Sequence, residues 1–112
     1  MANFQTVTAV KLGQAAITAT IATLYTTPAL SKTYVKQLDI CNTTGGTLLV
    51  DVHLVPVSGS ASTANAIYYT FSVAANSVLQ WKGIQVMDAG ETIKVKASST
   101  GLTITASGGE AV

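Results

Sequence analysis

Hydrophobic and polar residues alternate along most of this chain with the two-residue period of half-buried β-strands. In the segment 48–55, for example, the side chains of Leu48, Val50, Val52 and Leu54 line one face. No segment shows a sustained 3.6-residue apolar repeat, so we expect helices to be minor. The pattern predicts about eight strands, over residues 6–12, 17–25, 34–42, 48–55, 67–73, 92–97 and 102–106, and over 77–87, a run that is broken at Gly83 into 77–82 and 84–87.

Turn residues separate these segments. Pro28 ends one strand, Gly83 breaks another, and residues 88–91 (Asp-Ala-Gly-Glu) have the composition of a turn. We interpret Gly108 and Gly109 as turn glycines too. The longest small, polar stretch is 58–65, which predicts a surface loop with a helical turn near residues 61–64.

The strongest predicted hairpin joins strands 34–42 and 48–55 through Thr43-Thr44-Gly45-Gly46. Pairing Ile40 with Val50 would place Asp39 opposite Asp51, which is a destabilising like-charge pair. We therefore expect Ile40 opposite Leu48, with the loop glycines supplying positive φ angles. The stretch Asn42-Thr43-Thr44 also matches a glycosylation acceptor, but we interpret it as part of the turn.

Short antiparallel strands without a βαβ pattern predict an all-β fold, a single antiparallel β-sandwich of jelly-roll or immunoglobulin-like topology. The two cysteines that bracket a tryptophan in immunoglobulin domains are absent, and the strand count favours a jelly roll. We expect one domain over residues 1–112, with residues 1–15 forming an N-terminal arm or an edge strand.

The composition changes this picture from a lone domain to a subunit. Of the 112 residues, 48% are hydrophobic and only 10% charged, arginine is absent, and the net charge is +1. A monomer needs more surface charge to stay dispersed, so we expect the chain to bury surface against partners. Six scattered lysines make no nucleic-acid footprint, and no apolar run reaches the roughly 18 residues of a membrane span. The same scarcity of titratable groups argues against an enzyme.

Candidate chemistry is sparse. Cys41, Asp51 and His53 lie on the two strands of the predicted hairpin, but a zinc site needs three or four ligands and the chain has one His and one Cys. The preferred register places Val35, not Cys41, opposite His53, which removes a Cys–His pair. We therefore expect no catalytic residue, no metal and no cofactor.

The candidate functional residues belong instead to an interface. Tyr68 cannot share a face with its neighbours Ile67 and Tyr69, so one of these large side chains is expected to point away from the core and cover a partner. The long polar loop is the second candidate. The expected interface residues are Tyr68, Ser58, Ser60, Ser62, Asn65 and His53. An exposed Tyr68 or Trp81 could alternatively stack on a sugar ring, although alternation places Trp81 inward with Leu79.

An ordered series of segments resembles small virion structural proteins of tailed bacteriophages. It comprises Leu24-Tyr25-Thr26-Thr27-Pro28, Tyr34-Val35-Lys36, Asn42-Thr43-Thr44-Gly45, Leu54-Val55-Pro56, Gly83-Ile84, Asp88-Ala89-Gly90-Glu91-Thr92-Ile93 and Thr105-Ala106-Ser107-Gly108-Gly109-Glu110. The resemblance covers roughly residues 20–110 and carries no family functional residues.

The resemblance implies a non-enzymatic virion subunit, a capsid decoration or tail-associated protein, assembled in the host cytoplasm. Its expected partners are further copies of itself and other virion proteins such as major capsid or tail proteins, with no direct nucleic acid and no membrane. The alternative is a carbohydrate-binding β-sandwich module for recognition of a host or cell surface.

Overall fold

Eight strands form two antiparallel sheets in the computed structural model, which describes residues 7–112. The strands are β1 (Val7–Ile17), β2 (Ala22–Thr26), β3 (Lys32–Asn42), β4 (Leu48–Val55), β5 (Ala66–Val73), β6 (Val78–Met87), β7 (Thr92–Ala97) and β8 (Leu102–Ala111). Within this described part, the only helical element is the 3₁₀ turn η1 (Thr63–Asn65). The predicted all-β sandwich is therefore confirmed, and η1 falls close to the helical turn expected near residues 61–64.

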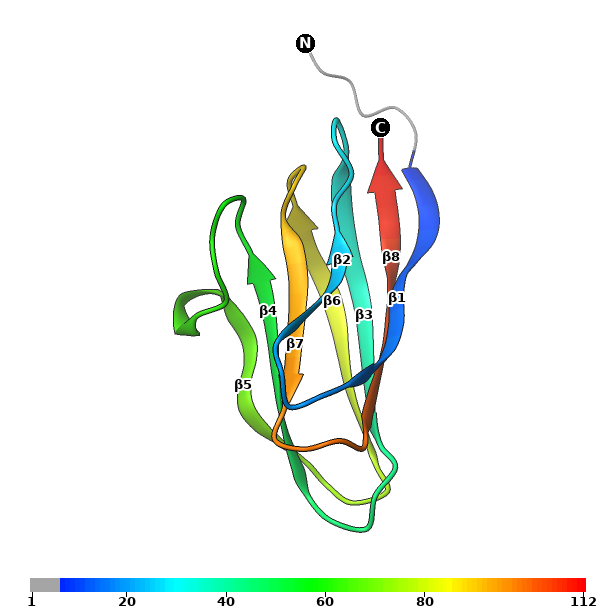
Figure 1. Cartoon of the computed structure of the whole chain (residues 1–112). Helices are drawn as coiled ribbons and strands as arrows, with labels where there is room; N and C mark the ends of the chain where they lie inside the picture. Colours follow the sequence, from blue (N-terminus) through cyan, green and yellow to red (C-terminus); the bar gives the residue numbers. More distant parts are fainter. Residues whose placement is uncertain (1–6) are drawn as a thin grey trace.

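The order of the strands identifies the topology. Sheet A has the order β1-β8-β3-β6 and sheet B the order β2-β7-β4-β5. β1 pairs with β8, β2 with β7, β3 with β6 and β4 with β5, so the first half of the chain runs back along the second half. This long double ribbon, rolled into two sheets, is a jelly roll. In Figure 1 the strands share one long direction and the turns lie at the two ends.

The core lies between the two sheets and is filled by alternate side chains of their strands. Leu38 and Ile40 from β3, with Leu102 and Ile104 from β8, are completely buried on the inner face of sheet A. Further buried members of the same cluster are Leu12, Ile17, Val35, Val50, Val52, Val73, Met87, Ile93, Val95, Ala97 and Ala106. Trp81 and Leu79 pack against this cluster, as alternation predicted.

The expected hairpin of residues 34–42 and 48–55 is wrong. β3 lies in sheet A and β4 in sheet B, so Ile40 faces Ile104 and Leu79 across its neighbouring strands rather than Leu48. The connection crosses from one sheet to the other, and the positive-φ glycines of the described residues are Gly90 and Gly101, not Gly45 and Gly46. Alternation reports which residues turn inward, but it carries no information about which strand pairs with which.

Another expected strand is divided by a crossing between the sheets. Ile17 ends β1 in sheet A and Ala22 begins β2 in sheet B, whereas the alternation had predicted one strand over 17–25. Thr18 O accepts a hydrogen bond of 2.9 Å from Ala97 N at this crossing. The prediction of an arm or edge strand over 1–15 falls partly on residues 1–6, outside the described residues; from Val7 onward the chain is the edge strand β1.

Glycines that were expected to end strands lie inside them. β6 runs unbroken through Gly83, where a bulge adds one residue to β6 relative to β3. β8 continues through Gly108 and Gly109 to Ala111, beyond the predicted end at residue 106. Gly108 lies opposite a bulge in β3, and a Cβ built there would be 1.8 Å from Tyr34 O. The backbones approach so closely that only glycine fits this position.

Asn42 organises the loops at one end of the sandwich. This buried side chain donates from Nδ2 to Gly46 O at 2.8 Å and to Val73 O at 3.0 Å. Its Oδ1 accepts from Thr44 N at 2.9 Å and from Thr44 Oγ1 at 2.7 Å. The arrangement is an Asx turn, which confirms the interpretation of Asn42-Thr43-Thr44 as a turn.

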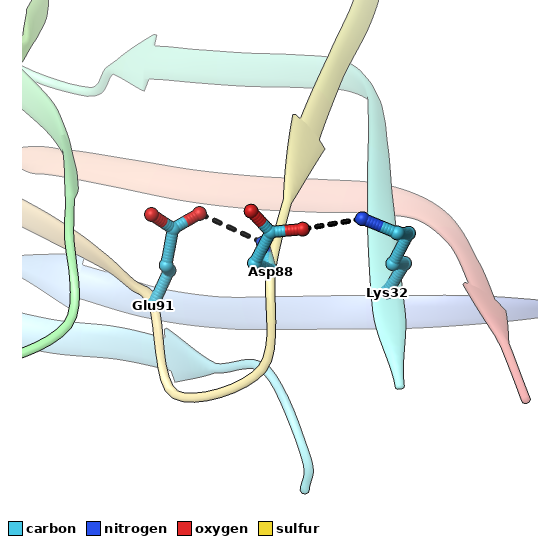
Figure 2. Close-up of polar contacts among 3 residues, drawn as sticks. All are labelled: Lys32, Asp88 and Glu91. Atoms are coloured by element: carbon cyan, nitrogen blue, oxygen red, sulfur yellow. Dashed lines mark hydrogen bonds and ion pairs between the residues drawn. The ribbon is translucent and has the colours of Figure 1, made fainter. Parts of the chain in front are cut away.

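The opposite end is tied by the turn between β6 and β7. Asp88 forms an ion pair with Lys32 at the start of β3, and Asp88 N donates to Glu91 Oε1 at 2.7 Å (Figure 2). The hydrogen bond with Asp88 raises the pKa of Lys32. Thr27 N also donates to Glu91 O at 2.9 Å, so this turn joins the end of β2 to the start of β3.

Tyr25 links the two sheets near this end. Its hydroxyl donates to Glu110 Oε2 of β8 and lies 2.8 Å from Oγ1 of the buried Thr33 of β3. Burial, followed by the hydrogen bond with Glu110, raises the pKa of Tyr25 to about 12. The protonated phenol therefore contributes to the contact between β2 and sheet A.

Replacing Gly108 tests the close approach of β8 and β3. We expect Gly108→Ala to lower the free energy of unfolding by roughly 2–4 kcal/mol, because the new Cβ would overlap a backbone oxygen that moves only with its strand. Urea denaturation measures the change. The matched control is Gly45→Ala, where a Cβ would meet nothing within 4 Å, so the expected change is within about 0.5 kcal/mol. Equal effects in the two variants would contradict the described register.

The raised pKa of Tyr25 predicts a loss of stability in alkali. The ordinary pKa of 10.0 applies to the unfolded chain and about 12 to the folded one, so folding favours the protonated phenol. This contribution is complete below pH 10 and is lost as the pH rises through about 12. Urea midpoints measured across this range should fall more steeply for the wild type than for Tyr25→Phe, and parallel curves would contradict the assignment.

Candidate functional site

The outer face of sheet B carries a loop anchored by a buried histidine. His53 of β4 points away from the core, yet it is only 4% exposed because the loop between β4 and β5 covers it. His53 Nδ1 lies 3.0 Å from Ser62 O and 2.9 Å from Asn65 Oδ1. Figure 1 shows this connection projecting at the left, beside β4 and β5.

The hydrogen bonds within the loop determine which histidine nitrogen carries the proton. Asn65 Nδ2 donates to Ser60 O at 2.9 Å, and Asn65 Oδ1 accepts from Ser62 N at 3.1 Å, which fixes the orientation of the amide. Both neighbours of His53 Nδ1 are therefore acceptors, so Nδ1 is the donor. In the neutral ring Nε2 is then an acceptor that no protein group among residues 7–112 uses.

The expected interface residues are thus partly brought together. His53, Ser62, Asn65 and the carbonyl of Ser60 form one hydrogen-bonded unit, whereas Ser58 lies in the preceding turn with a φ of 61°. Tyr68, which was expected at the interface, packs against the core instead, and burial raises its pKa.

A bulge in β5 explains why Tyr69, not Tyr68, faces outward. Val52 pairs with Tyr68 and Val50 with Phe71, so two steps along β4 correspond to three along β5. The extra residue reverses the alternation and leaves Tyr69 56% exposed. Thr70 has a φ of 45°, and its N–H donates to Asp51 Oδ1 at 2.6 Å. Sequence alternation could not reveal this bulge, since no glycine marks it.

Tyr69 lines a hollow of about 370 Å³ on the outer face of sheet B. Asp51 from β4, Lys96 from β7 and the anchored loop form its polar wall. The other lining residues are Ile21, His53, Ala61, Ser62 and Thr63. A smaller hollow of about 140 Å³ also contains Asp51 and Lys96, together with Thr70, so the two hollows adjoin along this pair.

An apolar hollow lies on the outer face of sheet A. A hollow of about 410 Å³ is lined there by Tyr34, Lys36 and Ile84, and by Val7, Ala9, Gly108 and Gly109. Ile84 is 61% exposed and its neighbour Val86 52% exposed. Both belong to β6, an edge strand whose second side pairs with no strand among the described residues. We call Tyr34, Ile84, Val86 and this free edge the β6 surface.

The cysteine and histidine that could have formed a reactive pair are separated. Cys41 lies on β3 of sheet A and His53 on β4 of sheet B, so the two residues do not share a sheet. Among residues 7–112, no three side chains of His, Cys, Asp or Glu gather where they could hold a metal ion. None of the helices in this part of the chain is long and apolar enough to span a membrane.

Structures of infectious bursal disease virus contain a fold similar to this jelly roll. The structure of the Gx strain of infectious bursal disease virus matches with a TM-score of 0.56 and 12% identity, over 96% of this chain and 32% of that chain. The T13 particle of the same virus gives a TM-score of 0.52 and 12% identity, over 98% and 31%. Its VP2 subviral particle gives 0.50 and 13%, over 95% and 32%.

The likeness is one of fold. At 12–13% identity it extends to no particular residue, and the chain spans about a third of the length of the capsid proteins it matches. No protein-family model matches the chain, and no curated protein matches it. The likeness therefore shows a jelly-roll fold, and it does not extend to the tailed-bacteriophage proteins that the sequence resembles.

Removing His53 tests how the loop is held. We expect His53→Ala to lower the free energy of unfolding by about 1–3 kcal/mol, because Asn65 Oδ1 and Ser62 O lose their shared donor. Hydrogen exchange of the backbone amides at residues 62–65 should also be faster in this variant. Ser58→Ala, outside the hydrogen-bonded unit, is the control and should leave both nearly unchanged. Unaltered exchange at residues 62–65 in His53→Ala would show that the histidine does not anchor the loop.

Proposed function

We propose that this protein is a non-enzymatic structural subunit of a virion, which acts by associating with further copies of itself and with other virion proteins. The observation that carries the proposal is the jelly-roll topology shared with viral capsid proteins. The sparse charge of the chain supports it, since a nearly uncharged surface is desolvated at little cost when subunits pack together.

Within this proposal, the finer role is that of a capsid decoration or tail-associated subunit of a tailed bacteriophage. The support for it is the ordered series of segments between residues 24 and 110. Major capsid or tail proteins are then the further partners. The single cysteine fits assembly in the reducing host cytoplasm.

The β6 surface is the contact that we assign to self-association. A free strand edge offers unpaired backbone donors and acceptors to a second copy, and Ile84 and Val86 add apolar area beside it. An antiparallel two-fold pair centred on Gln85 would set Ile84 opposite Val86. The same register would set Lys82 opposite Asp88, so opposite charges would meet across the interface.

Leu30 supports a second contact at the end of the sandwich. It lies in the turn between β2 and β3, is 90% exposed and has a φ of 61°. A leucine in the left-handed region costs roughly 1–2 kcal/mol, and its exposure to water adds to that cost. A neighbouring subunit that covered the side chain would recover the cost of exposure.

The assembly state of purified protein tests the proposal. We expect the wild type to sediment as a discrete oligomer, and Ile84→Lys to shift the population to monomer by at least ten-fold in dissociation constant, because the ammonium group would be desolvated in the contact. Thr100→Lys adds the same charge at an exposed turn and should leave the oligomer intact. A wild type that remains monomeric at high concentration, or an Ile84→Lys variant that associates normally, would contradict the proposal.

A further inference from the structure

The groove on the outer face of sheet B has features of a ligand site that the assembly function does not use. Two adjoining hollows of about 370 and 140 Å³ meet at Asp51 and Lys96, so the depression is elongated. It lies on the opposite face of the sandwich from the β6 surface, and both could be occupied at once. The larger hollow falls within the usual range of ligand pockets, about 300–1,000 Å³.

The groove contains hydrogen-bond donors and acceptors that no group among residues 7–112 uses. Asp51 Oδ1 is used by Thr70 N, and its second oxygen has no partner among residues 7–112. Lys96 Nζ and the Thr63 hydroxyl also have no hydrogen-bond partner within residues 7–112. In the neutral ring of His53, Nε2 adds an acceptor, because Nδ1 is the donor toward the loop. Donors and acceptors therefore occur together within one depression.

The charges of the groove select against a strongly charged ligand. Asp51 and Lys96 face each other as paired positions on β4 and β7 and cancel one another. An anion would meet the carboxylate and a cation the ammonium group, whereas a neutral molecule with many hydroxyl groups can both donate to Asp51 and accept from Lys96.

Tyr69 supplies the apolar element of such a site. Its ring is 56% exposed and lines the larger hollow. The face of an aromatic ring is electron-rich, so it attracts the weakly positive C–H groups on one face of a pyranose ring. The backbone that holds Tyr69 outward is strained, since the next residue, Thr70, has a φ of 45° and is fixed by Asp51. Strain of this kind concentrates at binding sites.

From these observations we infer that the groove binds a neutral oligosaccharide. Tyr69 stacks on a sugar ring, and Asp51 and Lys96 hydrogen-bond to its hydroxyls between the two hollows. The elongated shape suits a chain of more than one sugar. The residues are not those expected from the sequence for sugar stacking, because Tyr68 and Trp81 both pack against the core.

A glycan array followed by calorimetric titration tests the inference. The array should contain neutral hexose and N-acetylhexosamine oligosaccharides beside sialylated and sulfated ones, and the neutral group should give the binding. Titration of the best soluble neutral oligosaccharide should show at least ten-fold weaker binding for Tyr69→Ala and for Lys96→Ala. Both side chains are exposed, so the variants should keep the melting temperature of the wild type.

The controls separate this site from the rest of the surface. Tyr34→Ala removes a tyrosine from sheet A and should bind the oligosaccharide like the wild type. Tyr69→Phe keeps the ring and should retain most of the affinity. Binding to no glycan, binding to acidic glycans alone, or unchanged binding by Tyr69→Ala would each overturn the inference. None of these outcomes alters the sedimentation test of assembly, so the two proposals fail separately.

Discussion

The pairing of the first half of the chain with the second half is the constraint on which the rest of this structure depends. Each of the four pairs, from β1 with β8 to β4 with β5, joins strands from opposite halves, and rolling the ribbon places successive strands in different sheets, except for the adjacent pair β4 and β5. The core can form only when these distant segments meet. Two residues support contacts between distant segments. Gly108 lets β8 approach β3 closely, and Tyr25 bonds β2 to Glu110 of β8 in sheet A.

The sequence predicted the strands and their inward faces well, since burial imposes the two-residue period of Leu38, Ile40 and Leu102 directly. It failed where the backbone departs from that period. The bulge before Phe71 reversed the faces of Tyr68 and Tyr69, and the bulge at Gly83 was mistaken for a strand end. The sequence also could not predict which strands pair. Two consecutive strands show the same alternation whether they form a hairpin or lie in different sheets.

At the candidate site, too, the sequence revealed the composition but not which residues come into contact. Scarce charge and the polar loop were evident from the sequence, and they favoured interaction surfaces over chemistry. That His53 would hold the loop could not be foreseen, because it requires Ser62 and Asn65 to fold back over β4. Asp51 and Lys96 become neighbours only through the pairing of β4 with β7. The hollows on the two faces thus differ in chemistry: the one on sheet A is lined mainly by apolar residues, whereas those on sheet B contain Asp51 and Lys96.

The central claim is that the β6 surface of sheet A is a contact between copies of this chain in a virion. An electron cryomicroscopy reconstruction of the assembled protein tests this most directly. The account predicts a closed, symmetric assembly in which β6, with Ile84 and Val86, lies against a neighbouring subunit while the groove beside Tyr69 faces solvent. An assembly that leaves β6 exposed, or particles in which this jelly roll occurs as isolated monomers, would contradict the account.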